Sequence, residues 1–136
     1  MAIRIGLLMS LLAAAAVCGC NRAGYPDTTP VTGTVTYKGE PVEGATVQLT
    51  PNSPEGKPAN ARTDAQGKFK MKTFQDDDGA VPGKYGVTVS KVSHKGEGEG
   101  AAGDELPVKY KDPTTSGLTA DVPDSGPLDL PLELKD

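Results

Sequence analysis

Residues 31–50 read VTGTVTYKGEPVEGATVQLT, and this stretch decides the expected fold. Apolar or small residues alternate with polar ones over residues 31–37, and the same period of two returns over residues 45–50. Such alternation predicts β-strands with one buried side and one solvent-facing side. The intervening Lys38-Gly39-Glu40-Pro41 favours a turn. We therefore predict two neighbouring strands joined by a short connection.

The same alternation continues through the rest of the chain. It predicts further strands over residues 68–72, 84–90, 118–122 and 128–134. The 17 glycines and 12 prolines punctuate these runs, as expected for short strands and turns. We predict one small antiparallel β-sandwich of about seven strands over residues 31–136.

Three details refine this prediction. The sequence Asp64-Ala65-Gln66-Gly67 favours a tight hairpin turn with positive φ at the glycine. Pro131 has no N–H to donate, which indicates an edge strand or a break in one. Residues 95–103 have no apolar anchor and are interpreted as a mobile loop at one end of the sandwich.

The first 19 residues have the features of a secretory signal. Arg4 precedes an apolar run, Ile5 to Val17, that is short for a transmembrane helix. The run ends in Val17-Cys18-Gly19-Cys20, which resembles the lipobox of bacterial lipoproteins. That resemblance implies cleavage before Cys20 and attachment of a diacylglycerol, with acyl chains such as palmitate, to its sulfur. A disulfide between Cys18 and Cys20 would instead close a strained loop.

Residues 20–30 are polar, contain two prolines and show no period, so we predict a flexible tether between lipid and domain. The expected location is the cell membrane or the outer membrane, with the domain facing the periplasm or the exterior. The net charge of −4 argues against a nucleic-acid partner, which would require a basic face.

Three segments together resemble carboxypeptidase regulatory-like domains. They are residues 31–50, the stretch Thr63-Asp64-Ala65-Gln66-Gly67-Lys68-Phe69, and Pro82-Gly83-Lys84-Tyr85. Residues 106–122 resemble the form found in small bacterial lipoproteins of this type. The resemblance implies a transthyretin-like (prealbumin-like) β-sandwich that does not itself cut peptides.

Candidate catalytic groups are sparse. His94 is the single histidine, whereas a zinc peptidase needs several histidine and acidic ligands. Ser90 or Ser93 beside His94 has no third group placed by a motif, so a Ser-His-Asp site is not supported. Transthyretin-like hydrolases of hydroxyisourate use several histidines and a characteristic C-terminal tail, and both are missing here. We predict no catalytic residue and no cofactor.

The best metal candidate is the run Asp76, Asp77 and Asp78, because carboxylates suit Ca²⁺. Adjacent acids do not form the alternating pattern of an EF-hand loop. The sequence favours a solvated acidic turn at this position.

These observations predict a membrane-anchored, non-enzymatic lipoprotein of the cell envelope whose β-sandwich is a structural or binding module. Its expected partners are the membrane, through the N-terminal lipid, and an envelope protein or polysaccharide. The alternatives are a carrier or receptor for a small ligand or glycan, and a hydrolase. The chain has no tryptophan, so it offers little aromatic surface on which a sugar ring could stack.

Overall fold

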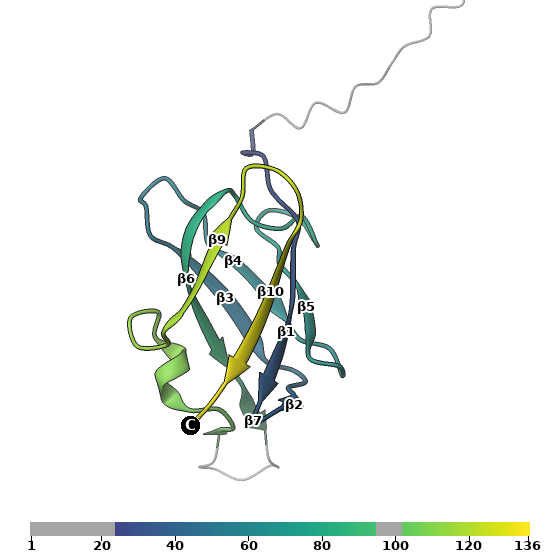
Figure 1. The fold of residues 1–136 in the computed structure, drawn as a ribbon, viewed down its shortest axis with the longest axis vertical. Coiled ribbons are helices and arrows are strands. Elements are labelled where there is room, and N and C mark those ends of the chain that lie inside the picture. Colours follow the sequence, from purple (N-terminus) through teal and green to yellow (C-terminus); the bar gives the residue numbers. More distant parts are fainter. Residues whose placement is uncertain (1–23, 95–101) are drawn as a thin grey trace, which may run out of the picture.

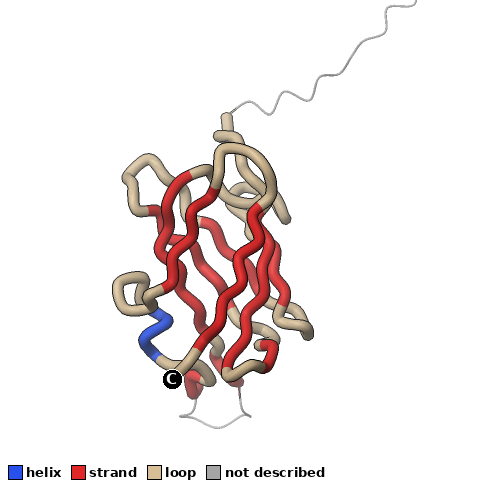
Figure 2. Tube along the Cα trace, viewed as in Figure 1, coloured by secondary structure: helices blue, strands red, loops and turns tan. Residues whose placement is uncertain are grey.

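The structure, a computed structural model, describes residues 24–94 and 102–136. These residues form two β-sheets that face each other (Figures 1 and 2). In the first sheet β1 (Val31–Tyr37) is paired with the other three strands, which are β2 (Glu40–Pro41), β5 (Lys68–Lys70) and β10 (Leu128–Leu134). The second has the order β4-β3-β6-β9, with β3 (Thr46–Pro51), β4 (Ala59–Arg62), β6 (Gly83–Ser90) and β9 (Leu118–Val122).

Two small elements complete the described fold. The strands β7 (Val92–His94) and β8 (Ala102–Asp104) form an antiparallel hairpin, and a 3-10 helix, η1, spans Val108–Lys111. No helix in the described residues is long and apolar enough to cross a membrane.

The core lies between the two sheets, and alternation along the strands supplies it. In β3, for example, Val47 and Leu49 are buried while Thr46 and Gln48 are exposed. The largest fully buried side chains come from both sheets and from Met71, which follows β5; those from the sheets are Tyr85, Leu49, Leu134, Val31, Val35, Val47, Val87 and Val89. The predicted fold class, a small all-β sandwich, is confirmed.

One strand pair departs from the predicted antiparallel arrangement. β1 and β10 run parallel, with Val31 opposite Leu128 and Tyr37 opposite Leu134. The period of two encodes which side chains are buried but not the direction of the neighbouring strand, so the sequence could not reveal this pairing. Pro131 lies in β10, which pairs only with β1 in its sheet, so the predicted edge-strand position is confirmed.

The other predicted strands lie where expected, with small shifts at their ends. β1, β9 and β10 have the predicted bounds, whereas β5 ends at Lys70 rather than at residue 72. β4 was not predicted, because Ala59-Asn60-Ala61-Arg62 carries only alanine on its buried side. The predicted loop over residues 95–103 is wrong at its end, since Ala102 and Gly103 lie in β8; residues 95–101 lie outside the described residues.

The folded domain begins before residue 31. The predicted tether, residues 20–30, therefore extends too far toward the C-terminus. Thr29 is buried, and it exchanges two backbone hydrogen bonds with Ala80, of 2.8 and 2.9 Å. Its hydroxyl also donates to the Pro123 carbonyl at 2.7 Å. Further out, the ring of Tyr25 stacks on that of Phe74 at a centroid separation of 4.5 Å. The polar composition that indicated a flexible tether does not reveal such packing.

Candidate functional site

The connection between β4 and β5 is a hairpin whose ladder is broken in the middle. At its closed end the N–H of Asp64 donates to the Lys68 carbonyl at 2.9 Å. At its open end Asn60 and Lys72 form an isolated β-bridge with hydrogen bonds of 3.0 and 2.9 Å. Between these points the strands separate, because β4 pairs with β3 and β5 pairs with β1.

The turn that closes this hairpin confirms the prediction for residues 64–67. The Asp64 Oδ1 accepts hydrogen bonds from the N–H groups of Gln66 and Lys68, each at 2.9 Å. Gly67 has a φ of +73°, a conformation that glycine adopts without steric cost. The turn therefore holds the start of β5 firmly against the end of β4.

A groove of about 950 Å³ lies over this broken hairpin, and we call it the β4–β5 groove. The outward-facing positions of β1, β3, β4 and β5 surround it, and buried residues beneath them also contribute. Its lining comprises Thr32, Gly33, Thr34, Thr46, Asn60, Ala61, Arg62, Asp64, Lys68, Phe69, Lys70, Lys72, Asp77 and Asp129.

Four cations and three carboxylates line the groove, in a chain whose net charge is −4. The ammonium group of Lys70 lies 3.9 Å from Asp77, and that of Lys72 lies 3.3 Å from Asp76, which is outside the groove. Within the described ranges, neither Arg62 nor Lys68 forms an ion pair. With Asp76 included the formal charges of this region balance, but Arg62 and Lys68 are cations without a paired carboxylate, which favours an anionic group of a ligand beside them.

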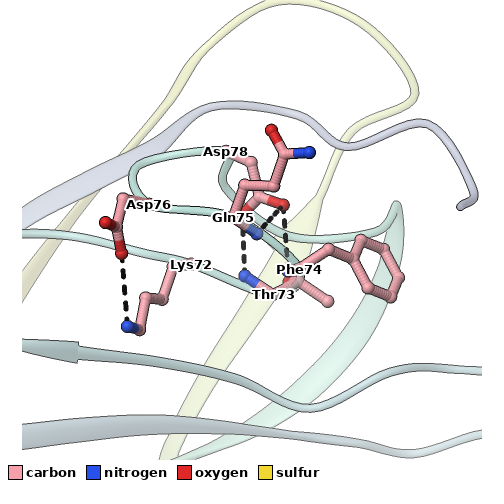
Figure 3. A network of polar contacts seen from close by, with 6 residues as sticks. All are labelled: Lys72, Thr73, Phe74, Gln75, Asp76 and Asp78. Atoms are coloured by element: carbon pink, nitrogen blue, oxygen red, sulfur yellow. Dashed lines mark hydrogen bonds and ion pairs between the residues drawn. The ribbon is translucent and has the colours of Figure 1, made fainter. Parts of the chain in front are cut away.

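The acidic run 76–78 forms a loop in which each carboxylate has a separate role, and Figure 3 shows Asp76 and Asp78 with their partners. Asp76 pairs with Lys72, and Asp77 lies near Lys70. The Asp78 carboxylate accepts the backbone N–H groups of Thr73, Phe74 and Gln75, at 2.7, 2.9 and 3.0 Å. Partial burial raises the pKa of Asp78, but these hydrogen bonds outweigh it and leave the pKa below its usual value.

We expect Asp78→Asn to destabilise the domain by about 1–2 kcal/mol at neutral pH, after allowance for partial exposure. The amide presents an NH₂ group where one carboxylate oxygen accepted the N–H groups of Phe74 and Gln75. Because folding lowers the pKa of Asp78, its contribution is present above about pH 4 and is lost as the pH falls further. Urea unfolding at pH 7 and pH 3 measures this.

Asp76→Asn is the matched control for this prediction. The Asp76 side chain is 91% exposed and contacts only Lys72 in the described parts of the chain, so we expect unchanged stability. Equal effects of the two substitutions, or an Asp78→Asn effect that persists undiminished at pH 3, would contradict the role of the Asp78 carboxylate as acceptor of these backbone N–H groups.

The described residues contain no group of three or more His, Cys, Asp or Glu side chains that could share a metal ion. In particular, the candidates Asp76, Asp77 and Asp78 are not gathered into one site. Cys20 lies outside the described residues, and His94 is in β7 with its side chain outside the described features, as is that of Ser93. Ser90 ends β6 and lies opposite Thr46.

Sequence comparison identifies the family to which this sandwich corresponds. The family profile for the carboxypeptidase regulatory-like domain matches residues 30–132, about three quarters of the chain. The chain belongs to this family. Carboxypeptidase regulatory-like domains are non-catalytic modules. A search of curated proteins gave no match.

Two solved structures are similar over 81% of the chain. A DUF3823 family protein from Parabacteroides merdae is 17% identical, with a TM-score of 0.44 over 47% of its own length. A 9R-lipoxygenase from Cyanothece is 11% identical, with a TM-score of 0.38 over 16% of its length. The chain thus spans about half the length of the first protein and a small part of the second.

Sequence reasoning did not find the β4–β5 groove. Part of the signal was present, since Lys68, Lys70 and Lys72 occupy successive solvent-facing positions. Their association with Arg62 and Thr46 depends on how β4 and β5 separate and pair with different sheets. That separation is a tertiary feature, which alternation along a single strand does not encode.

Proposed function

We propose that this protein is a non-enzymatic module of the cell envelope, held at a membrane by lipid on Cys20. The observation that supports this most is the lipobox-like Val17-Cys18-Gly19-Cys20, placed a few residues before a regulatory-like β-sandwich. Two or three acyl chains would hold the domain stably, since one chain alone binds a membrane only marginally.

The structure favours a binding role over a purely structural one. The β4–β5 groove supports this role, because its Arg62 and Lys68 are free of ion pairs within the residues described. The groove has hydroxyl, amide and cationic groups but no arrangement of nucleophile, base and orienting acid. The function is therefore retention of a partner at the membrane rather than its chemical conversion.

Substitution of Cys20 by serine is expected to abolish attachment of the processed protein to the membrane through lipid. Serine lacks the thiol that accepts the diacylglycerol, so the protein should move from the membrane pellet to the soluble fraction or remain as an uncleaved precursor. Fractionation of cells, with detection of the protein in each fraction, measures this.

Cys18→Ser is the matched control. Cys18 is removed with the leader under this proposal, so the variant should remain in the membrane fraction. If Cys20→Ser partitions with membranes as a processed protein, or if both variants are released equally, the lipid anchor is excluded.

A further inference from the structure

We infer that the β4–β5 groove binds an acidic polysaccharide that carries a carboxylate on successive sugar units. This deepens the proposed function, because it rests on the binding role and names the chemistry of the partner. The groove is distinct from the N-terminal anchor, so the two proposals can fail separately.

The cationic side chains of the groove are regularly spaced. Lys68, Lys70 and Lys72 project from the same side of one extended segment, so neighbouring lysines are about 6–7 Å apart along it. Arg62 faces the groove from β4, across the opening. A row of cations with a guanidinium opposite suits a linear polymer with regularly repeated carboxylates, and the guanidinium can bind one of them in bidentate fashion.

Between the cations, the groove carries uncharged polar groups. Thr32 and Thr34 of β1, Thr46 of β3 and Asn60 of β4 also line the groove. Their hydroxyl and amide groups can both donate and accept hydrogen bonds, which matches the hydroxyl groups of a sugar. The aromatic residue of the lining, Phe69, is 3% exposed, so the groove offers charge and hydrogen bonds rather than a stacking surface.

The carboxylates of the groove, together with Asp76 beside Lys72, balance its four cations in formal charge, but none of them pairs with Arg62 or Lys68. Asp64 is engaged by two N–H groups of the turn, and Asp77 lies beside Lys70. Asp129 faces the groove from β10 on the far side of β1. Arg62 and Lys68 are therefore the cations best placed to bind the carboxylates of a ligand, since no described residue forms an ion pair with either.

The broken ladder argues against an acidic peptide as the occupant. Strand addition needs an exposed sheet edge, yet this opening is closed at both ends by Asn60–Lys72 and Asp64–Lys68 hydrogen bonds. Only the stretch around Arg62 and Lys70 is open between them. An extended peptide would therefore find no continuous edge, whereas side-chain recognition of a glycan needs none.

The test uses the protein purified in detergent from the cells that make it, and hexagalacturonate as the probe. Calorimetry should show binding that weakens as salt rises, because the contacts are exposed ion pairs. Arg62→Glu/Lys68→Glu should weaken binding about tenfold or more, since it replaces two attractions by repulsions. The neutral Arg62→Gln/Lys68→Gln should show an intermediate loss.

Lys57→Glu/Lys84→Glu is the charge-matched control. Both lysines are exposed and lie outside the groove, so binding should stay within about threefold of the original. Absence of binding by the unmodified protein, an equal loss in the control, or equal binding of hexaglutamate would overturn the inference; the last result would assign the groove to acidic peptides. Membrane fractionation is unaffected by these variants, so it still tests the anchor independently.

Discussion

Replacing Gly33 by alanine is expected to lower the free energy of unfolding by about 3 kcal/mol, at the upper end for overpacking. A Cβ at this position would lie 2.2 Å from the Leu130 carbonyl oxygen and 2.4 Å from the Phe69 ring. The ring could turn, but the carbonyl belongs to the backbone of β10, opposite Gly33 in the parallel ladder. Relief therefore requires β1 and β10 to move apart.

Thermal unfolding followed by circular dichroism measures this effect, and the expected fall in Tm is roughly 10–20 °C. Gly39→Ala is the control, because Gly39 has a φ of +82° but nothing within 4 Å of the added methyl group. It should cost only about 1 kcal/mol of backbone strain. A Gly33→Ala variant as stable as Gly39→Ala would show that β10 does not lie against β1 as described.

Leu49→Ala is the second substitution with a large expected effect, a loss of about 2–5 kcal/mol. Leu49 is fully buried in β3, where it lies opposite Ala59 of β4 and Val87 of β6. The small neighbour on β4 leaves little side-chain material to fill the space, so the cavity would persist. Equilibrium unfolding in urea at neutral pH measures the loss.

The adjacent Gln48→Ala provides the matched comparison. Gln48 lies on the same strand but faces solvent, so its truncation should change the stability by no more than about 0.5 kcal/mol. Similar effects at the two positions would mean that β3 does not bury the face assigned to it.

The sequence predicts the strands of this domain well because most of them bury one side only. Val31, Val35, Val47 and Leu49 alternate with polar residues, and each is buried as the period requires. The sequence does not predict β4, because its inward residues are Ala59 and Ala61. Two alanines do not distinguish a buried strand from a loop.

The sequence does not predict the parallel pairing of β1 with β10 or the β4–β5 groove, and the reason is related. Both depend on which strands become neighbours. The sequence of β1 does not reveal that it pairs with β10, and the sequences of β4 and β5 do not reveal that they pair with different strands. Turn chemistry, in contrast, is local. The Asp64 side chain and the left-handed Gly67 were therefore predictable, because the contacts that fix this turn lie within five residues.

The central claim is that this sandwich is displayed at a membrane through lipid on Cys20. The most direct measurement is mass spectrometry of the N-terminal peptide of the protein extracted from its own membranes. We expect a peptide that begins at Cys20 and carries a diacylglyceryl group on the sulfur. A peptide that begins elsewhere, or a Cys20 with a free thiol, would contradict it.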